Sequence, residues 1–107
     1  MITAIYYRSY NRLTVDGHAN SGDPGHDLVC AGASTLVYTL VANVGNLEDI
    51  GQARNSTVNL ETGYAEISCE AKRKSKAMVD RIFEAVCVGF EMLAQSYPQY
   101  ITYEIHG

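Results

Sequence analysis

Residues 27–44 read DLVCAGASTLVYTLVANV, and their apolar side chains recur at the spacing of one face of an α-helix. Asp27 stands where a helix N-cap is expected, and Gly45 is a residue type that commonly follows the last turn of a helix. The pattern therefore predicts a helix from Asp27 to about Val44. Its predicted apolar stripe comprises Val29, Ala33, Leu36, Val37, Leu40, Val41 and Val44.

Two short extended segments precede this helix. Residues 2–8 are rich in β-branched and aromatic side chains, and a second extended run goes from Arg12 to about Ala19. Between them, Asn11 can take the positive φ that a tight hairpin turn requires. In the second run the apolar residues share one face, and Arg12, Thr14, Asp16 and His18 share the other. This alternation places His18 at the end of a strand, on its polar side.

The second half of the chain repeats this order. Residues 54–61 and 63–71 are typical of a hairpin that turns at Thr62–Gly63, and the periodicity predicts a helix from about Ser75 to Tyr97. Pro98 ends that helix, and Tyr100–His106 alternates as a last strand. The order ββαββαβ predicts a two-layer α+β fold, with one mixed or antiparallel sheet of about five strands and two helices. The pattern does not predict the order of the strands.

The composition is that of a small globular protein. The chain has 107 residues, of which 47% are hydrophobic and 19% charged, so we expect residues 1–107 to form one domain. A net charge of −4 argues against direct binding of nucleic acid through phosphate contacts. No uninterrupted apolar run approaches the roughly 20 residues that span a bilayer, so we expect no membrane partner and no signal peptide. Three cysteines without close spacing favour free thiols and a cytoplasmic location.

The chemistry predicted from the sequence centres on Cys30. If Asp27 caps the helix, Cys30 lies in the first turn, where unpaired backbone N–H groups and the helix dipole favour a thiolate nucleophile. His18 and Cys30 are joined by a glycine-containing loop, which allows the imidazole to reach the thiol as a cysteine–histidine dyad requires. Asp27 is most simply a cap and is also able to orient a histidine. Ser34 lies one turn after Cys30 on the same face.

Each of these residues also has a plainer interpretation. Free cysteines are often buried packing residues, which accounts well for Cys69 and Cys87 and less well for Cys30. His26 is a competing base for the thiol, although a loop histidine can simply be solvated. A metal site is not predicted, because zinc sites show paired ligands at short spacing and the chain has none. We expect no cofactor.

Two sequence motifs resemble a known family. The element Gly17-His18-Ala19, then Gly25, then the segment 27–34 (DLVCAGAS) resemble the signature of the ribosomal-processing cysteine proteases (Prp) of Firmicutes and related bacteria. The separation of His18 from Cys30 fits that family, and so do the chain length and the element order. Two features depart from the family pattern. Gly32 stands where the family has alanine, and the stretch 43–54 does not match the family sequence.

The resemblance implies a Cys/His peptidase with Cys30 as nucleophile and His18 as general base and acid. Asp27 and Ser34 match motif positions and are possible supporting residues. The loop would be a mobile lid that orders on substrate; it comprises Asn20, Ser21, Gly22, Asp23, Pro24 and Gly25. Family members remove a short N-terminal extension from the large-subunit ribosomal protein L twenty-seven, cutting after an aromatic pair, and are homodimers.

Two other functions remain open from the sequence. A related peptidase acting on a phage capsid or scaffold protein would have the same residues, since some relatives are encoded with phage structural genes. A non-catalytic binding module for ribosome or phage assembly would use Cys30 and His18 only for packing. Thiol alkylation distinguishes the binding module from a peptidase, because a catalytic cysteine reacts well below pH 8.

Overall fold

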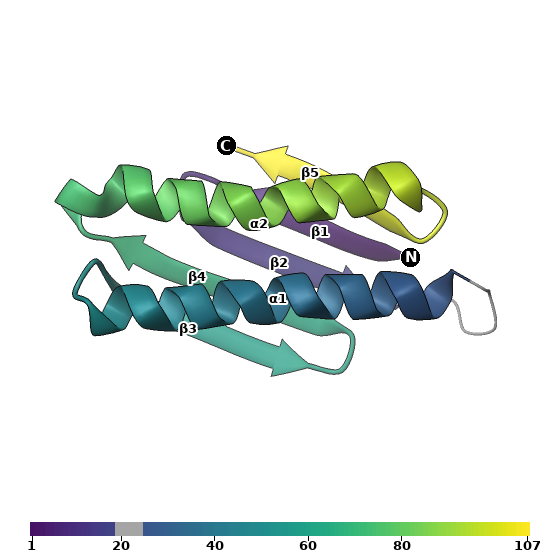
Figure 1. The fold of residues 1–107 in the computed structure, drawn as a ribbon, viewed down its shortest axis with the longest axis horizontal. Coiled ribbons are helices and arrows are strands. Elements are labelled where there is room, and N and C mark those ends of the chain that lie inside the picture. Colours follow the sequence, from purple (N-terminus) through teal and green to yellow (C-terminus); the bar gives the residue numbers. More distant parts are fainter. Residues whose placement is uncertain (19–24) are drawn as a thin grey trace.

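Two α-helices cover one face of a five-stranded sheet within residues 1–18 and 25–107, which the computed structural model describes (Figure 1). The element order ββαββαβ confirms the predicted α+β fold. The elements are β1 (Ile2–Tyr7), β2 (Arg12–Gly17), α1 (His26–Asp49), β3 (Ala53–Glu61), β4 (Tyr64–Ala71), the short 3₁₀ turn η1 (Arg73–Ser75), α2 (Lys76–Ser96) and β5 (Ile101–His106).

The sheet has the order β3-β4-β2-β1-β5, and only the β1–β5 pairing among these neighbours is parallel. The sheet is therefore mixed, with β3 and β5 at its edges. The end of β2, the start of α1 and the turn between β3 and β4 all lie at the same end of the molecule, on the right of Figure 1. This arrangement brings three segments that are separate in the sequence to one place.

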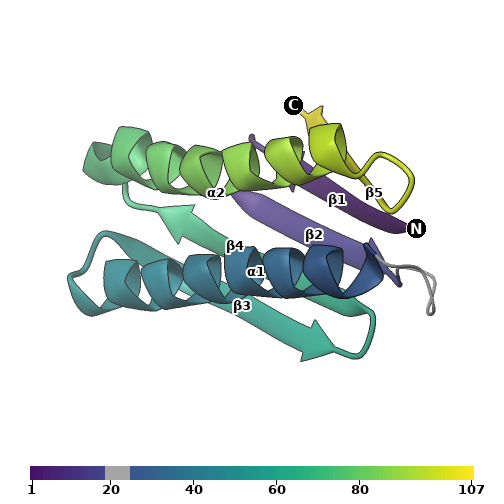
Figure 2. The same cartoon turned by 45° about the vertical axis from the view of Figure 1, so that its right-hand side comes forward.

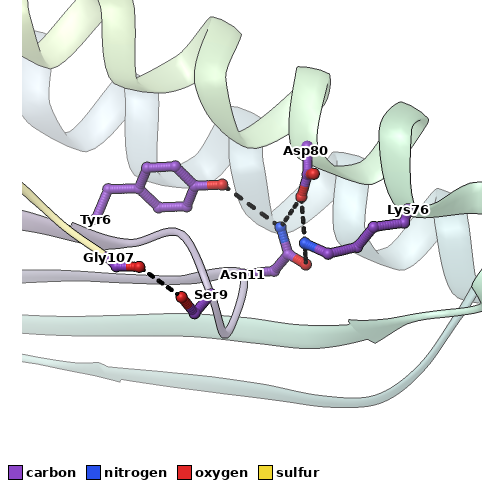
Figure 3. Close-up of polar contacts among 6 residues, drawn as sticks. All are labelled: Tyr6, Ser9, Asn11, Lys76, Asp80 and Gly107. Atoms are coloured by element: carbon purple, nitrogen blue, oxygen red, sulfur yellow. Dashed lines mark hydrogen bonds and ion pairs between the residues drawn. The ribbon is translucent and has the colours of Figure 1, made fainter.

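Both hairpins turn where the sequence predicts. Asn11 has a φ of 46° and Gly63 has a φ of 76°, so each residue occupies the left-handed region that its turn needs. Asn11 is also buried, which the sequence did not indicate. Its side-chain amide donates to Asp80 at 2.8 Å and accepts from Lys76 at 3.0 Å (Figure 3). The first hairpin is thereby tied to α2.

The core lies between the helices and the sheet face that they cover (Figure 2). Tyr6 of β1 stacks on Phe83 of α2, with ring centroids 5.8 Å apart. The predicted stripe of α1 is largely confirmed, and Leu47 extends it. The buried residues of α2 are Val79, Phe83, Val86, Cys87 and Phe90. Thr14 departs from the prediction, because it is buried although it lies on the polar face. It sits on a central strand, between Ile5 of β1 and Glu66 of β4, and these neighbours cover it.

Helix α1 ends five residues beyond the predicted end at Val44. Gly45 lies inside the helix, where an added Cβ would meet nothing within 4 Å. Burial of Leu47 offsets the roughly 1 kcal/mol that an interior glycine costs. The helix stops instead at Gly51, whose φ is 76°. The N–H groups of Gly51 and Gln52 donate to the carbonyls of Glu48 and Leu47, which is the Schellman arrangement.

The start of α1 also differs from the prediction. Gly25 occupies the N-cap position, no side chain caps the helix, and the N–H of Val29 already donates to the Gly25 carbonyl at 3.1 Å. Asp27 is therefore not the cap; it lies inside the first turn with a fully exposed side chain. Cys30 is consequently the fifth helical residue and not the third. The cap lies two residues earlier than predicted, because His26 and Asp27 both take helical geometry.

Helix α1 is long and apolar enough to cross a membrane by length and composition, with a mean hydropathy of 1.6 over its most apolar window. The apolar residues of α1 do not form an uninterrupted run of about 20, because Ser34, Thr35, Thr39 and Asn43 lie among them; small and β-branched residues between the stripe positions raise the average. In the fold, the stripe from Val29 to Leu47 packs on the sheet.

Tyr6→Phe should make the protein less sensitive to alkaline pH. Burial, and then the negative charge of Asp80, raises the pKa of Tyr6 from 10.0 to about 12. The unfolded chain loses this proton near pH 10 while the folded protein keeps it. The stabilisation from Tyr6 is therefore full below about pH 10 and is lost as the pH rises towards about 12. Urea denaturation between about pH 9 and about pH 11.5 should show a steeper fall for the wild type, whereas parallel slopes would contradict this account.

Candidate active site

An open pocket of about 240 Å³ lies where β2 ends, α1 begins and the β3–β4 turn comes close. One wall is a row of α1 residues spaced four apart: His26, Cys30, Ser34 and Tyr38. Residues at this spacing lie above one another on a helix, so a single helix face presents all four to the pocket. The opposite wall includes His18, Leu60, Gly63 and Tyr64. The pocket thus brings the predicted nucleophile together with both candidate bases.

The imidazole in contact with the Cys30 sulfur is that of His26. Its Nε2 lies 3.7 Å from Cys30 Sγ, and its Nδ1 lies 3.1 Å from Asp27 Oδ1. The His26 side chain is 23% exposed, whereas Asp27 is fully exposed. Asp27, His26 and Cys30 therefore form a continuous chain of polar contacts along the first turns of α1. Asp27 therefore contacts a histidine, His26, and does not cap the helix.

His18 lies across the pocket, just after β2. The glycine before it is required by the backbone, because Gly17 has a φ of 108° and an added Cβ would stand 2.2 Å from the Met1 carbonyl oxygen. The ring of His18 packs on Gly63, where an added Cβ would lie 2.3 Å from its Nε2. His18 and Cys30 line the same pocket, but no hydrogen bond joins them among the residues that the structure describes.

The position of Cys30 changes its relation to the helix terminus. The three helical residues without an intrahelical partner for their N–H are His26, Asp27 and Leu28, since the hydrogen-bond ladder begins at Val29. The expectation that Cys30 itself lies among free N–H groups is therefore wrong. Those groups lie one turn nearer to the N-terminus of α1. Ser34 is one turn further along and lines the pocket with an exposed side chain.

The other two cysteines have the environment of packing residues, as predicted. Both are buried in the core. Burial raises the pKa of Cys87 to about 11, and burial followed by the charge of Glu48 raises the pKa of Cys69. Both side chains are thus held as neutral thiols. A larger cavity of about 540 Å³ lies at the far end of the sheet beside Cys69, but its one thiol is this protonated and buried group.

The remaining site predictions concern a metal and the loop. The described part of the chain contains no group of three or more His, Cys, Asp or Glu residues that could hold a metal ion. Of the predicted substrate loop, Asn20, Ser21, Gly22, Asp23 and Pro24 lie outside the described residues. Gly25 is described: it is the N-cap of α1, and an added Cβ would stand 2.7 Å from the ring of Tyr100.

Sequence reasoning missed two features of this site. The contact of His26 with Cys30 was recognised only as a competing possibility, although the four-residue spacing along a helix predicts neighbours once His26 is counted as helical. The aromatic wall residues Tyr38 and Tyr64 were not singled out. No local pattern identifies Tyr64, since it reaches the pocket through the pairing of β4 with β2.

Comparison with known proteins places this site in a family. The family model described as "Cysteine protease Prp" matches residues 1–102. The chain belongs to the Prp cysteine protease family. It is accordingly a cysteine protease, which is a hydrolase, and the resemblance noted in its motifs is confirmed.

Named relatives agree with this assignment. The ribosomal processing cysteine protease Prp of Mycoplasma pneumoniae is 27% identical over 96 residues, which cover 90% of this chain and 88% of the relative. The Prp of Staphylococcus aureus is 54% identical over 26 residues, which cover 24% of each chain.

Solved structures share the fold of this Prp family member. A Streptococcus mutans protein is 30% identical, with a TM-score of 0.66, and the match covers 97% of this chain and 90% of the other. The S. aureus Prp solved with a covalently linked product peptide has a TM-score of 0.73 at 23% identity, over 99% of this chain and 100% of the other. The same protease has also been solved with a substrate peptide, with a TM-score of 0.70 at 20% identity over 98% and 97% of the chains.

Proposed function

We propose that the chain is an endopeptidase that removes a short N-terminal extension from the large-subunit ribosomal protein L twenty-seven. The observation that carries this proposal is the placement of the Cys30 thiol in an open pocket that also presents two imidazoles, those of His18 and His26. Membership of the Prp family supports it, because the named relatives are ribosomal processing proteases. The S. aureus relative binds substrate and product peptides, which supports a protein substrate here.

The proposed reaction is covalent catalysis by the Cys30 thiolate. The sulfur attacks the scissile carbonyl carbon, the C–N bond breaks, and the departing amine takes a proton from an imidazole. Water then hydrolyses the acyl-enzyme and releases the thiolate. His18 is the general base and acid that the family resemblance implies. No metal or organic cofactor is required by these steps.

The pocket walls support a substrate with aromatic residues beside the cleaved bond. Tyr38 from α1 and Tyr64 from β4 line the pocket together with the apolar side chains of Leu60 and Val15. Aromatic rings pack favourably against other aromatic and apolar side chains. An extension that ends in an aromatic pair, as the resemblance implies, fits such walls.

Intact mass spectrometry of the organism's own precursor of this ribosomal protein, incubated with the chain, tests the proposal. We expect the loss of one short N-terminal peptide. A precursor that stays intact while Cys30 alkylates rapidly would reject the ribosomal substrate, keep the protease and direct the search to phage capsid or scaffold proteins. An intact precursor with Cys30 alkylating no faster than Cys69 and Cys87 would support the binding module instead.

Two further parts of the proposal follow from the substrate and the resemblance. We place the reaction in the cytoplasm, where ribosomes assemble. The homodimer implied by the resemblance stays a prediction, as does the treatment of residues 1–107 as one protease domain.

A further inference from the structure

The resemblance implies His18 as the histidine of the site, but the histidine in contact with the Cys30 sulfur is His26. We propose that His26, oriented by Asp27, is a further catalytic residue that accepts the proton of the Cys30 thiol in the free enzyme. The inference rests on the proposed function and divides its proton chemistry between two imidazoles. His26 would generate the thiolate, and His18 would serve the departing amine and the attacking water.

The geometry of α1 fixes this contact. His26 and Cys30 are four residues apart on one helix, so their side chains are neighbours whatever the rest of the chain does. The helix start is held in place, because Val29 is fully buried and Gly25 packs against the ring of Tyr100. The resulting separation between Nε2 and Sγ is 3.7 Å, within the range for a hydrogen bond to sulfur. His18, by contrast, belongs to another element and packs on Gly63.

The contact with Asp27 sets which nitrogen can act as a base. A carboxylate only accepts hydrogen bonds, so Asp27 Oδ1, at 3.1 Å, favours the tautomer with the proton on Nδ1 of His26. The lone pair of the neutral ring then lies on Nε2, the atom that faces the sulfur. In the proposed transfer the S–H bond breaks, the proton binds Nε2, and the electron pair stays on Cys30 Sγ. The product is a thiolate next to an imidazolium.

The helix field acts mainly on His26. The N-terminal end of α1 carries a partial positive charge, which opposes an imidazolium at the first helical residue, and this field weakens beyond the first turn, where Cys30 lies. The negative charge of Asp27 offsets the effect on the imidazolium, although its full exposure keeps the attraction weak. Among the described residues, the other titratable side chains that line the pocket are those of His18 beyond β2, Glu61 and Tyr64 of the β3–β4 hairpin, and Tyr38 of α1.

The test compares His26→Gln with His18→Gln in two assays. Glutamine retains hydrogen-bonding groups and cannot act as a base at neutral pH. We expect His26→Gln to slow iodoacetamide alkylation of Cys30 about tenfold at about pH 6.5, with recovery at about pH 9, where hydroxide removes the proton. His18→Gln should alkylate Cys30 within about twofold of the wild-type rate and yet fail to cleave the precursor. His106→Gln, a surface histidine away from the pocket, is the matched control.

The outcomes separate this inference from the proposed function. Wild-type alkylation rates at about pH 6.5 in a folded His26→Gln variant would overturn the role of His26, whatever the substrate is. Slow alkylation in His18→Gln, with His26→Gln unaffected, would assign the thiol proton to His18. A His26-dependent alkylation rate in a protein that leaves the ribosomal precursor intact would support His26 and reject the substrate. Circular dichroism of each variant establishes that α1 is still formed.

Discussion

Cys30→Ala should abolish cleavage of the ribosomal precursor and leave the fold intact. The substitution removes the sulfur that forms the acyl-enzyme, and loss of a covalent nucleophile costs on the order of 10⁴- to 10⁶-fold in rate. The fold should tolerate the change, because Cys30 is only partly buried at the edge of the core and alanine is the best helix former. We therefore expect stability to change by about 1 kcal/mol or less.

The measurement is the initial rate of precursor cleavage, followed by intact mass, beside urea denaturation of the same samples. Cys87→Ala is the matched control, since it also removes a thiol from a helix but lies in the core, away from the pocket. It should cleave normally while losing some stability to the cavity that it creates. Normal turnover by Cys30→Ala would exclude Cys30 as the nucleophile.

Phe83→Ala should cause the largest loss of stability that we expect from a core substitution. Phe83 is fully buried and stacks on Tyr6, which joins α2 to the interior strand β1. Truncation of a buried phenylalanine removes its transfer free energy and leaves a cavity, which together cost about 3 to 5 kcal/mol. A small domain is stable by only about 5 to 15 kcal/mol, so Phe83→Ala should remove a large share of the free energy of unfolding.

Urea denaturation at neutral pH measures this effect. Val88→Ala is the control on the same helix, because Val88 is 55% exposed and its truncation should change the free energy of unfolding by about 0.5 kcal/mol or less. A loss below about 1 kcal/mol for Phe83→Ala would contradict the central place of the Tyr6–Phe83 stack in the core.

The backbone turns show how local rules made much of the fold predictable. Asn11 and Gly63 take positive φ where the hairpins need it, and each result depends on the chemistry of one residue. The end of α1 shows the limit of the same rules. Gly45 and Gly51 are both plausible stops by residue type, and burial of Leu47 between them carries the helix on to Gly51.

The amino-acid sequence by itself determined the α+β class and the positions of the hairpins, and it supplied the prediction that Cys30 is the reactive thiol. These follow from periodicity, turn chemistry and motif spacing, which act over a few neighbouring residues. Only the tertiary structure decided the strand order, the burial of Thr14 and which imidazole contacts the sulfur. His26 reaches Cys30 because the cap of α1 lies two residues earlier than its sequence suggests, and His18 packs on Gly63 because the β3–β4 turn lies beside the end of β2. The contact of His18 depends on how separate elements pack, which no local pattern contains, whereas the contact of His26 depends on where α1 begins.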